Sequence, residues 1–469
     1  MVLDFLLIPG QRIHIVGIGG SGMSAIARVL LETGYVISGS DEHTNPITDS
    51  LQADGATIFA RHDGPNIIGA ELVIASSAIP DSNVELQAAR AFKIPVLRRR
   101  EAISLITNNL RTIAISGTHG KTTTTALMTH ILMEAGLEPS YIIGGVLKNT
   151  GTNAGAGSGD YFVIEADEYQ GMFLGLNPAV AIVTNIEFDH PDIFPTFEDV
   201  VEIFRQFVAR LPEDGLLVAC ADNPAAYAMA QERQANMLPV VTYGVQTTTA
   251  DWTATHITPN QDGSTTFVVK QAGGRLGEVT VPLAGKHNVQ NALAVIATAR
   301  HLKIPFAIIT NAMQTFSGTG RRSEIMGQVA GVTVVSDYAH HPTAIQVNLE
   351  AWASRPGLNR LWAVWQPHTY NRLRALAPEF AASFQQAHQV LVTDVYSVRE
   401  TVTPGLAPPD LVKMIQAAGQ TNARYAGNLE QTAELLGNEV QRGDCVLIFS
   451  AGDAPQIGTM LLNTLGGKK

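Results

Sequence analysis

The chain has 469 residues, which is too long for one compact core and predicts two to four domains. Hydrophobic residues make up 45% of it and charged residues 16%, a composition typical of folded soluble proteins and unlike that of disordered ones. The formal net charge of −11 argues against non-specific binding to nucleic acid or to an anionic membrane, so we expect neither as a partner.

The cysteines and the N-terminus favour a cytoplasmic location. Cys220 and Cys445, the only two cysteines, lie far apart in the sequence, which indicates neither a disulfide framework nor a zinc cluster and fits a reducing compartment. Asp4 interrupts the N-terminal apolar run and no basic segment precedes it, so we expect no signal peptide. No apolar run reaches the roughly 18 residues that a membrane-spanning helix needs.

Three segments of the chain have the pattern of an apolar strand, a turn and then a helix. They begin at Ile13, Arg111 and Gly331, with the sequences IHIVGIGG, RTIAISGTHGKT and GVTVVSDYAHHP. Strands that alternate with helices form parallel sheets covered on both faces, so the pattern predicts an α/β fold with domains at 1–108, 109–320 and 321–469. Within the middle domain, residues 246–283 show short alternating runs between turn signals, which predicts a small antiparallel insertion.

The first of these strands ends in a glycine loop. Residues 17–22, GIGGSG, fit G-x-G-x-x-G, and Asp41 follows a second strand about 20 residues further on. Such glycines let the backbone approach a pyrophosphate at a helix N-terminus. By itself the loop suggests an NAD-dependent dehydrogenase. The same geometry would hold another nucleotide diphosphate, such as a UDP-sugar, and a glycine-rich turn without a ligand is the third alternative.

The second strand ends in a phosphate loop. Residues 117–122, GTHGKT, open a helix that we expect to end before Gly136. Backbone N–H groups there can cradle phosphates, Lys121 can reach the terminal phosphates, and the Thr122 hydroxyl can bind Mg²⁺. The loop departs from the standard P-loop because Ile115 stands where that motif has a glycine. A regulatory ATPase would also carry such a loop, but the glycine loop would then have no role.

Two further strands of the middle domain end in acidic residues. YFVIEADE delivers Glu165, Asp167 and Glu168, and VAIVTNIEFDH delivers Asn185, Glu187, Asp189 and His190. Ligands gather at the carboxyl ends of strands in open α/β sheets, so these side chains should stand near the phosphate loop. Mg²⁺ takes oxygen ligands and keeps several waters, so one or two carboxylates suffice. Each acid alone could lie in a solvated turn, but two acid-ended strands after a phosphate loop favour a metal–nucleotide site.

Six separated motifs together resemble the Mur ligase family. GTHGKTTT, EADE, TNIEFDH, GKHNVQNALA, FSGTGRR and DYAHHP occur in the order seen in that family and span nearly the whole chain. IGGSGMS near the start, the two histidines of DYAHHP, and QPHTYNR resemble the members that add L-alanine. The nearest alternative within the family is a recycling ligase that adds a whole peptide to the same sugar nucleotide.

The resemblance implies an ATP-dependent amide-forming ligase of peptidoglycan precursor synthesis. A Rossmann-like first domain would bind UDP-N-acetylmuramate, a central P-loop ATPase-type domain would bind ATP and Mg²⁺, and a Rossmann-like third domain would help bind ATP and L-alanine. The glycine loop is then assigned to the UDP diphosphate rather than to NAD. L-Alanine would be joined to the sugar carboxylate through an acyl phosphate, with ADP and phosphate released, by a monomer or a homodimer.

The resemblance also implies roles for individual residues. The UDP-sugar would contact Gly17, Gly19, Gly20, Ser21, Gly22, Asp41 and Ser76. ATP would contact Gly117, Thr118, His119, Gly120, Lys121, Thr122, Thr123, Asn185, His287, Asn288, Asn291, Arg322 and Asp337. The metal ligands would be Thr122, Glu165 and His190, the amino-acid contacts His340, His368 and Arg372, and the catalytic groups Lys121, Arg322 and His340.

Taken one at a time, several of these residues also have structural interpretations. His287 could cap the helix predicted for HNVQNALAVIATARHL, and Asp337 could cap the helix that follows it. Arg322 could belong to a solvated basic pair, and His368 could be a turn histidine. The residues that could support the site without contacting a ligand are His119, His341, Asp167, Glu168 and Asp189. Only the joint order of the motifs favours the functional interpretations.

The sequence predicts that activity needs no carbamylated lysine. Several related ligases use one after the D-H motif to help hold a second metal, whereas residues 191–211 here contain no lysine. Ligation rates measured with added bicarbonate and after its removal should therefore be equal. A rate that rises with bicarbonate and falls without it would contradict this prediction.

Overall fold

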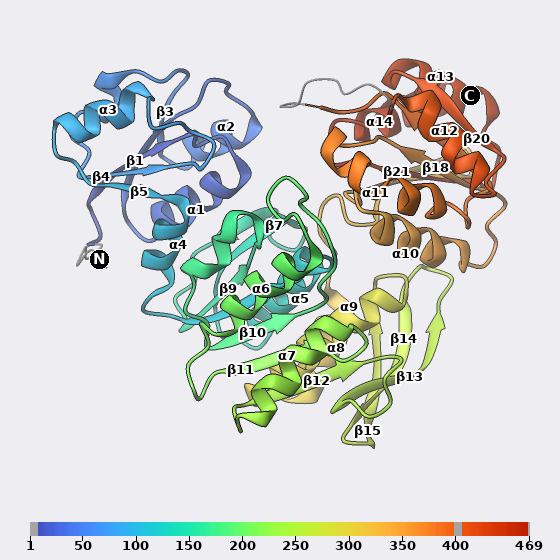
Figure 1. Cartoon of the computed structure of the whole chain (residues 1–469), viewed down its shortest axis with the longest axis horizontal. Coiled ribbons are helices and arrows are strands. Elements are labelled where there is room, and N and C mark those ends of the chain that lie inside the picture. Colours follow the sequence, from blue (N-terminus) through green and yellow to red (C-terminus); the bar gives the residue numbers. More distant parts are fainter. Residues whose placement is uncertain (1–7, 398–405, 468–469) are drawn as a thin grey trace.

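The computed structural model describes residues 8–397 and 406–467, and its strands form three separate sheets (Figure 1). The strands of the three sheets lie within residues 12–98, 111–281 and 324–449. Helices cover the sheets, so the chain has the three-domain α/β architecture that the alternating strands and helices predicted. Figure 1 shows the first domain (blue) and the third (orange to red) both standing on the central one.

The first domain has five parallel strands in the order β3-β2-β1-β4-β5. The direction of the strand order reverses between β1 and β4, and ligands of open α/β sheets bind at such a switch point. The glycine loop follows β1 and therefore lies at this point. The elements are β1 (Arg12–Val16), α1 (Ser21–Glu32), β2 (Val36–Ser40), α2 (Pro46–Ala53), β3 (Thr57–Phe59), β4 (Leu72–Ala75), α3 (Val84–Ala91), β5 (Val96–Arg98) and α4 (Arg99–Thr107).

The central domain is built on a ten-stranded mixed sheet in the order β15-β14-β13-β12-β11-β10-β6-β9-β7-β8. β6 lies between β10 and β9, so the phosphate loop and the two acidic strand ends meet at one edge. The first elements are β6 (Arg111–Ser116), α5 (Lys121–Glu134), β7 (Ser140–Leu147), β8 (Thr152–Gly155), β9 (Tyr161–Glu165), β10 (Val180–Val183) and α6 (Phe197–Val208). The next are β11 (Leu216–Cys220), α7 (Pro224–Ala235), β12 (Val240–Gly244), α8 (Lys286–His301) and α9 (Phe306–Thr315).

The antiparallel strands predicted for residues 246–283 are present. They are β13 (Trp252–Pro259), β14 (Thr265–Gln271) and β15 (Gly274–Val281). They do not form a separate layer, because β13 pairs in parallel with β12 through Tyr243 and Trp252 and so continues the central sheet. The insertion therefore widens the sheet away from the phosphate loop.

The third domain has six strands in the order β16-β17-β21-β18-β19-β20. Only the edge strand β16 runs antiparallel to its neighbour; the other pairs are parallel. The strands are β16 (Glu324–Val329), β17 (Val332–Asp337), β18 (Leu361–Trp365), β19 (Gln389–Thr393), β20 (Ala423–Gly427) and β21 (Cys445–Phe449). The helices are α10 (Pro342–Ala353), α11 (Tyr370–Ala382), α12 (Pro408–Ala417), α13 (Leu429–Glu439) and α14 (Pro455–Gly467).

Burial explains why the segments on either side of the phosphate loop form the strand β6 and the helix α5. In β6 only Arg111 is exposed, while the five residues up to Ser116 are buried. Such an uninterrupted apolar run is what a parallel strand needs when helices cover both faces of its sheet. Helix α5 is buried on nearly all sides and packs against β7, α8 and α9. The phosphate loop is therefore fixed between a buried strand and a buried helix.

Two features of the structure can be compared with what the sequence predicted: the state of its cysteines and the length and apolar character of its helices. Cys220 and Cys445 are both buried and free of disulfides. Burial raises the pKa of Cys220 to about 11 and that of Cys445 to about 12, so both thiols are protonated at neutral pH. Across the described ranges, no helix combines the length and the apolar character that crossing a bilayer requires.

Candidate active site

One cavity of about 620 Å³ is lined by all three domains. The first domain contributes Ser21, Gly22 and Arg99 to its wall. The expected residues of the other domains that line it are Thr118, His119, Gly120, Lys121, Thr122, Thr123, Glu165, Asn185, His190, His287, Asn288, Asn291, Arg322, Asp337 and His340. The expected residues outside this lining are Gly17, Gly19, Gly20, Asp41, Ser76, Gly117, His368 and Arg372. The expected phosphate, metal and catalytic residues therefore mostly share one space.

The glycine loop is braced by its own domain. Gly17 has a φ of +80°, and its N–H donates to the carbonyl oxygen of Ser40 at 2.8 Å. The Asp41 carboxylate accepts the N–H of Gly19 at 2.9 Å, so here this acid holds the loop instead of standing free for a ribose. Ser76 lies across the loop, where a Cβ added to Gly17 would come within 3.1 Å of the Ser76 Cβ.

The phosphate loop requires glycine and is pinned to β10. A Cβ at Gly117, whose φ is +138°, would lie 2.0 Å from Thr184 Oγ1. The loop amide of Thr118 donates to the Asn185 carbonyl oxygen at 3.0 Å, and that of His119 donates to Asn185 Oδ1 at 2.8 Å. Gly120 has a φ of +80° and begins α5. Hydrogen bonds within the chain therefore fix the backbone of the loop.

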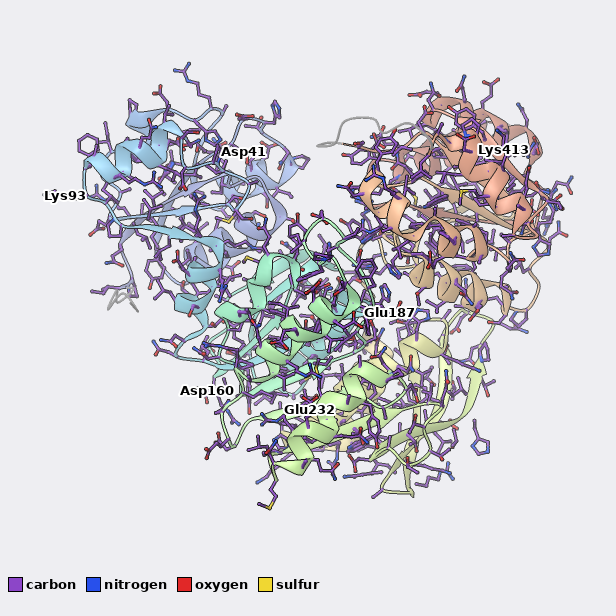
Figure 2. The ribbon with its side chains drawn as sticks, in the orientation of Figure 1. Asp41, Lys93, Asp160, Glu187, Glu232 and Lys413 are labelled. Atoms are coloured by element: carbon purple, nitrogen blue, oxygen red, sulfur yellow. The ribbon has the colours of Figure 1, made fainter. Side chains whose placement is uncertain are left out.

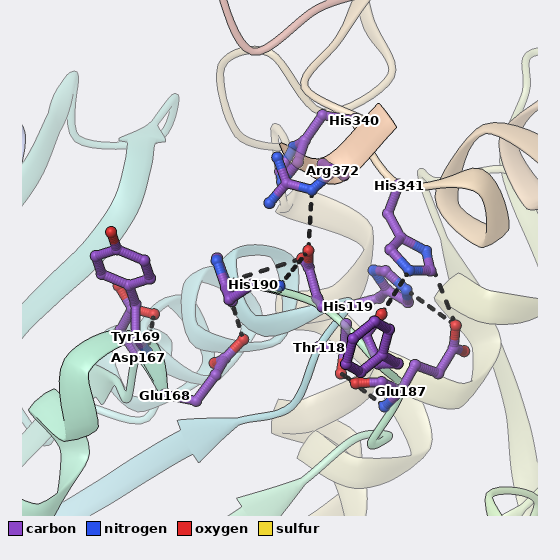
Figure 3. A network of polar contacts seen from close by, with 12 residues as sticks. Thr118, His119, Asp167, Glu168, Tyr169, Glu187, His190, His340, His341 and Arg372 are labelled. Carbon is purple, nitrogen blue, oxygen red and sulfur yellow. Dashed lines mark hydrogen bonds and ion pairs between the residues drawn. The ribbon is translucent and has the colours of Figure 1, made fainter. Parts of the chain in front are cut away.

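Lys121 is held in an ion pair with a buried carboxylate. Its Nζ lies 2.9 and 3.0 Å from the two carboxylate oxygens of Glu168 and donates to the Gly117 carbonyl oxygen at 2.6 Å. Burial alone would lower the pKa of Lys121, but the carboxylate of Glu168 and its acidic neighbours raise it above the ordinary value. His190 Nε2 stands 3.6 Å from Glu168 Oε1 (Figure 3). Glu168 therefore connects the loop lysine with the D-H histidine.

The three expected metal ligands, Thr122, Glu165 and His190, all line the cavity. Thr122 Oγ1 donates to Glu165 Oε1 at 3.2 Å, and Arg322 Nη2 donates to Thr122 Oγ1 at 2.9 Å. The other oxygen of Glu165 accepts the N–H of Gly144 at 2.7 Å. His190 instead faces Glu168. Thr122 and Glu165 thus offer adjacent oxygen atoms of the kind that Mg²⁺ prefers, with Arg322 from the third domain beside them.

The end of β17 and the loop that follows it bring Asp337 and His340 to the cavity. Asp337 Oδ2 accepts the N–H of Ser323 at 2.6 Å and its Oδ1 accepts the N–H of Ala339 at 2.7 Å, so it braces the loop. Burial raises the pKa of Asp337. His340 Nδ1 faces the Tyr338 carbonyl oxygen at 2.8 Å, and burial, with the charge of Arg372, holds the pKa of His340 well below its usual range. The imidazole is therefore neutral at pH 7.

Arg372 joins the third domain to the central one. Its Nε donates to Asp189 Oδ1 at 2.9 Å, and both side chains are buried (Figure 3). His368 Nδ1 lies 3.4 Å from Arg372 Nη1. The two residues are four apart in the sequence but do not share a helix, because α11 begins at Tyr370. They meet through a turn at Thr369, whose φ is +60°.

The sequence analysis missed two parts of the cavity wall. Arg99 begins α4, and its guanidinium covers Gly22 so closely that a Cβ there would lie 2.4 Å from Arg99 Cζ. Its Nε is buried without a hydrogen-bond partner. At the other end, Asp222 follows β11 and accepts hydrogen bonds from the N–H of Thr247 and from Gln290 Nε2, both at 2.7 Å. The polar end of β11, Asp222-Asn223, was the available signal for the second.

Three family models match successive parts of the chain. They are described as the Mur ligase family catalytic domain, matching residues 12–111, the Mur ligase middle domain, matching 115–299, and the Mur ligase glutamate ligase domain, matching 321–452. Together they cover most of the chain and follow the three sheets in order.

Curated relatives and solved structures match over the full length. The UDP-N-acetylmuramate–L-alanine ligase of Geobacter sp. (strain M21) is 40% identical, over 98% of this chain and 99% of that protein. The ligase of the same name from Caldanaerobacter subterraneus is 38% identical, over 96% and 97%. The crystal structure of UDP-N-acetylmuramate-alanine ligase from Thermotoga maritima has a TM-score of 0.81 at 27% identity, over 98% and 100%. A murein peptide ligase from Psychrobacter arcticus has a TM-score of 0.68 at 26% identity, over 97% and 99%.

The Lys121–Glu168 ion pair leads us to predict how its variants change the stability of the fold. Glu168→Ala should lower the free energy of unfolding by about 1–3 kcal/mol, because the largely buried Lys121 ammonium loses its carboxylate partner. The double variant Lys121→Met/Glu168→Leu should recover most of that loss, since both charges are then absent. Urea denaturation of the three proteins measures this. Equal stability of the single and the double variant would contradict it.

Proposed function

The chain belongs to the Mur ligase family, and we propose that it joins L-alanine to the carboxylate of UDP-N-acetylmuramate with conversion of ATP to ADP and phosphate. It is an ATP-dependent amide-forming ligase of peptidoglycan precursor synthesis. The observation that carries the proposal is that one cavity is lined by the end of the glycine loop at Ser21 and Gly22, by the phosphate loop and by His340 of the third domain. The dehydrogenase hypothesis is wrong, because the family has a different activity.

The reaction needs an activated carboxylate. A carboxylate oxygen is a poor leaving group, so an amine does not displace it at neutral pH. Transfer of the γ-phosphoryl group of ATP to the sugar carboxylate gives an acyl phosphate and ADP. The alanine amine then attacks the acyl carbon, a tetrahedral intermediate forms, the amine loses a proton, and phosphate departs as the amide bond forms.

Positioning and charge do most of the work in phosphoryl transfer. We propose that Lys121 and the phosphate-loop amides hold the ATP phosphates and that Arg322 reaches the transferred group from the third domain. Support comes from the Arg322–Thr122 hydrogen bond, which brings that guanidinium to the start of α5. Thr122 and Glu165 would hold Mg²⁺, which when bound neutralises charge on the phosphates. His287, Asn288 and Asn291 at the start of α8 are proposed for the nucleotide side.

The sugar nucleotide is assigned to the first domain. We propose that the glycine loop receives the UDP diphosphate at the N-terminus of α1, with Ser76 and Asp41 at the same strand edge. Arg99 is the added candidate for this anion, because it stands between Gly22 and the cavity and has a buried donor without a partner. The three domains would divide at 1–108, 109–320 and 321–469.

The amino acid is assigned to the third domain. His340 is neutral, so its imidazole can accept a proton from the attacking amine, which is the role that we propose for it. Arg372 uses Nε for Asp189, and its remaining N–H donors are proposed to hold the alanine carboxylate beside His368. We propose a cytoplasmic location, where ATP is available and the two free thiols stay reduced.

Phosphate release is the direct test of the proposed substrates. The protein with ATP, Mg²⁺ and UDP-N-acetylmuramate should release phosphate when L-alanine is added, and mass spectrometry should find the amide product. A peptide-adding ligase would instead respond to a tripeptide. ATP turnover that needs no amino acid would refute the ligase assignment.

Lys121→Ala should abolish ligation without unfolding the protein. Loss of one charge contact in the transition state typically costs about 10²–10³ in rate. The variant should also lose some stability, because the buried Glu168 loses its lysine, but His190 remains 3.6 Å from Glu168 and the protein should still fold. The checks are phosphate release and circular dichroism. A folded variant with near-normal turnover would contradict the assignment of residues 117–122 as an ATP-phosphate loop.

Arg372→Lys should weaken the use of alanine. Lysine cannot reproduce the two parallel hydrogen bonds of a guanidinium to a carboxylate. The wild type should use L-alanine well and a tripeptide poorly, because the peptide carboxylate lies further from its amine, and glycine should be used only modestly less well, since one methyl group contributes about 1 kcal/mol. We expect the KM for alanine to rise more than that for ATP. An unchanged KM for alanine, or better use of the tripeptide, would contradict the assignment.

A further inference from the structure

Two histidines and one carboxylate converge at the junction of the central and third domains. His119 comes from the phosphate loop, Glu187 follows β10, and His341 is the N-cap of α10. His119 Nε2 lies 3.4 Å and His341 Nδ1 lies 3.9 Å from the same atom, Glu187 Oε2. The centroids of the two imidazole rings are 4.7 Å apart. Figure 3 shows both rings gathered beside Glu187, and Figure 2 places that residue where the two domains meet.

We propose that the His119–Glu187–His341 cluster binds one divalent transition-metal ion of the zinc class, in addition to the magnesium at Thr122 and Glu165. Zinc with ligands at about 2.0–2.1 Å in a tetrahedron sets neighbouring ligand atoms about 3.3–3.4 Å apart. The 3.4 Å separation of His119 Nε2 from Glu187 Oε2 has that value, and the 3.9 Å separation of His341 Nδ1 from the same oxygen would shorten when the ion binds. Two imidazoles and a carboxylate form the donor set of zinc sites that keep a fourth position open, and imidazole favours zinc over Mg²⁺.

The surroundings of the ligand atoms also fit a metal. His341 Nε2 faces the Phe188 carbonyl oxygen at 3.2 Å, so its N–H can donate there and leave Nδ1 unprotonated. Metal-bound histidines usually donate their other N–H in this way. Thr343 Oγ1 donates to Glu187 Oε2 at 2.7 Å and fixes the carboxylate. The 3.3 Å contact of the Thr343 N–H with His341 Nδ1 is the bond that a metal would replace.

A metal in this cluster would tie two domains together. His119 and Glu187 belong to the central domain and His341 to the third, so one ion would bridge them. Catalysis requires these domains to close around the substrates and reopen to release the products. The bridging ion should therefore raise the thermal stability of the enzyme and slow its steady-state turnover, and it should do so while Mg²⁺ is saturating.

Cobalt titration tests the proposal, because tetrahedral Co²⁺ has a strong visible absorption that octahedral Co²⁺ lacks. The full-length protein, held in excess Mg²⁺, is titrated with Co²⁺ and then with Zn²⁺. We expect one equivalent of tetrahedral absorption that Zn²⁺ removes. Glu187→Gln and His341→Gln should each weaken Co²⁺ binding by at least about 100-fold, since even residues that only support a metal ligand contribute about 10–100-fold.

Glu165→Gln and His190→Gln are the matched controls. They make the same two substitutions in the same cavity but outside the cluster, and both should keep the tetrahedral absorption. Glu187→Gln is nearly isosteric, so the test survives if His341→Gln fails to fold. Absence of tetrahedral absorption in the wild type, its retention in Glu187→Gln, or its loss in the controls alone would overturn the proposal.

Discussion

The backbone of the phosphate loop depends on the neighbouring strand β10. Thr184 and Asn185, just after that strand, form hydrogen bonds with backbone carbonyl and amide groups of the loop. Position 117 must be glycine, because any side chain there would collide with Thr184. The amides that remain at the start of α5 are therefore presented in a fixed arrangement. Preorganised donors of this kind stabilise developing charge without reorganising during the reaction.

The same segment that holds the loop also contacts the third domain. Within TNIEFDH, Glu187 accepts a hydrogen bond from Thr343 and Asp189 pairs with Arg372. Arg322 adds a third link, to Thr122. Each link joins a residue of the central domain with one of the third domain. A shift of the third domain would therefore change the contacts of the start of α5 and of the TNIEFDH segment at once.

Local motifs were readable from the sequence because their chemistry is local. A strand, a glycine loop and a helix start follow one another along the chain, so the two loops, the acidic strand ends and the order of the elements could be predicted. Pairings between residues far apart in the sequence could not be predicted in this way. Glu168 as the partner of Lys121, and Arg99 as the cover of Gly22, depend on how separate elements pack. Asp41 and Asp337 bond to backbone amides of nearby loops, which their acidity did not reveal. The contact between His368 and Arg372 likewise depends on the turn at Thr369, whose φ is +60°.

The order of strands in the central sheet bears on how the protein is made. β6 pairs with β9 and β10, which both follow it in the chain. Other helices and strands lie between β6 and each of these partners in the sequence. Closing such long stretches of chain is slow, since their entropy is lost before the contacts form. The first sheet, by contrast, uses only the first quarter of the sequence and is complete early on the ribosome. During synthesis the half-built central sheet would expose the apolar edge of β6, so this stage is where a nascent chain is most exposed to aggregation.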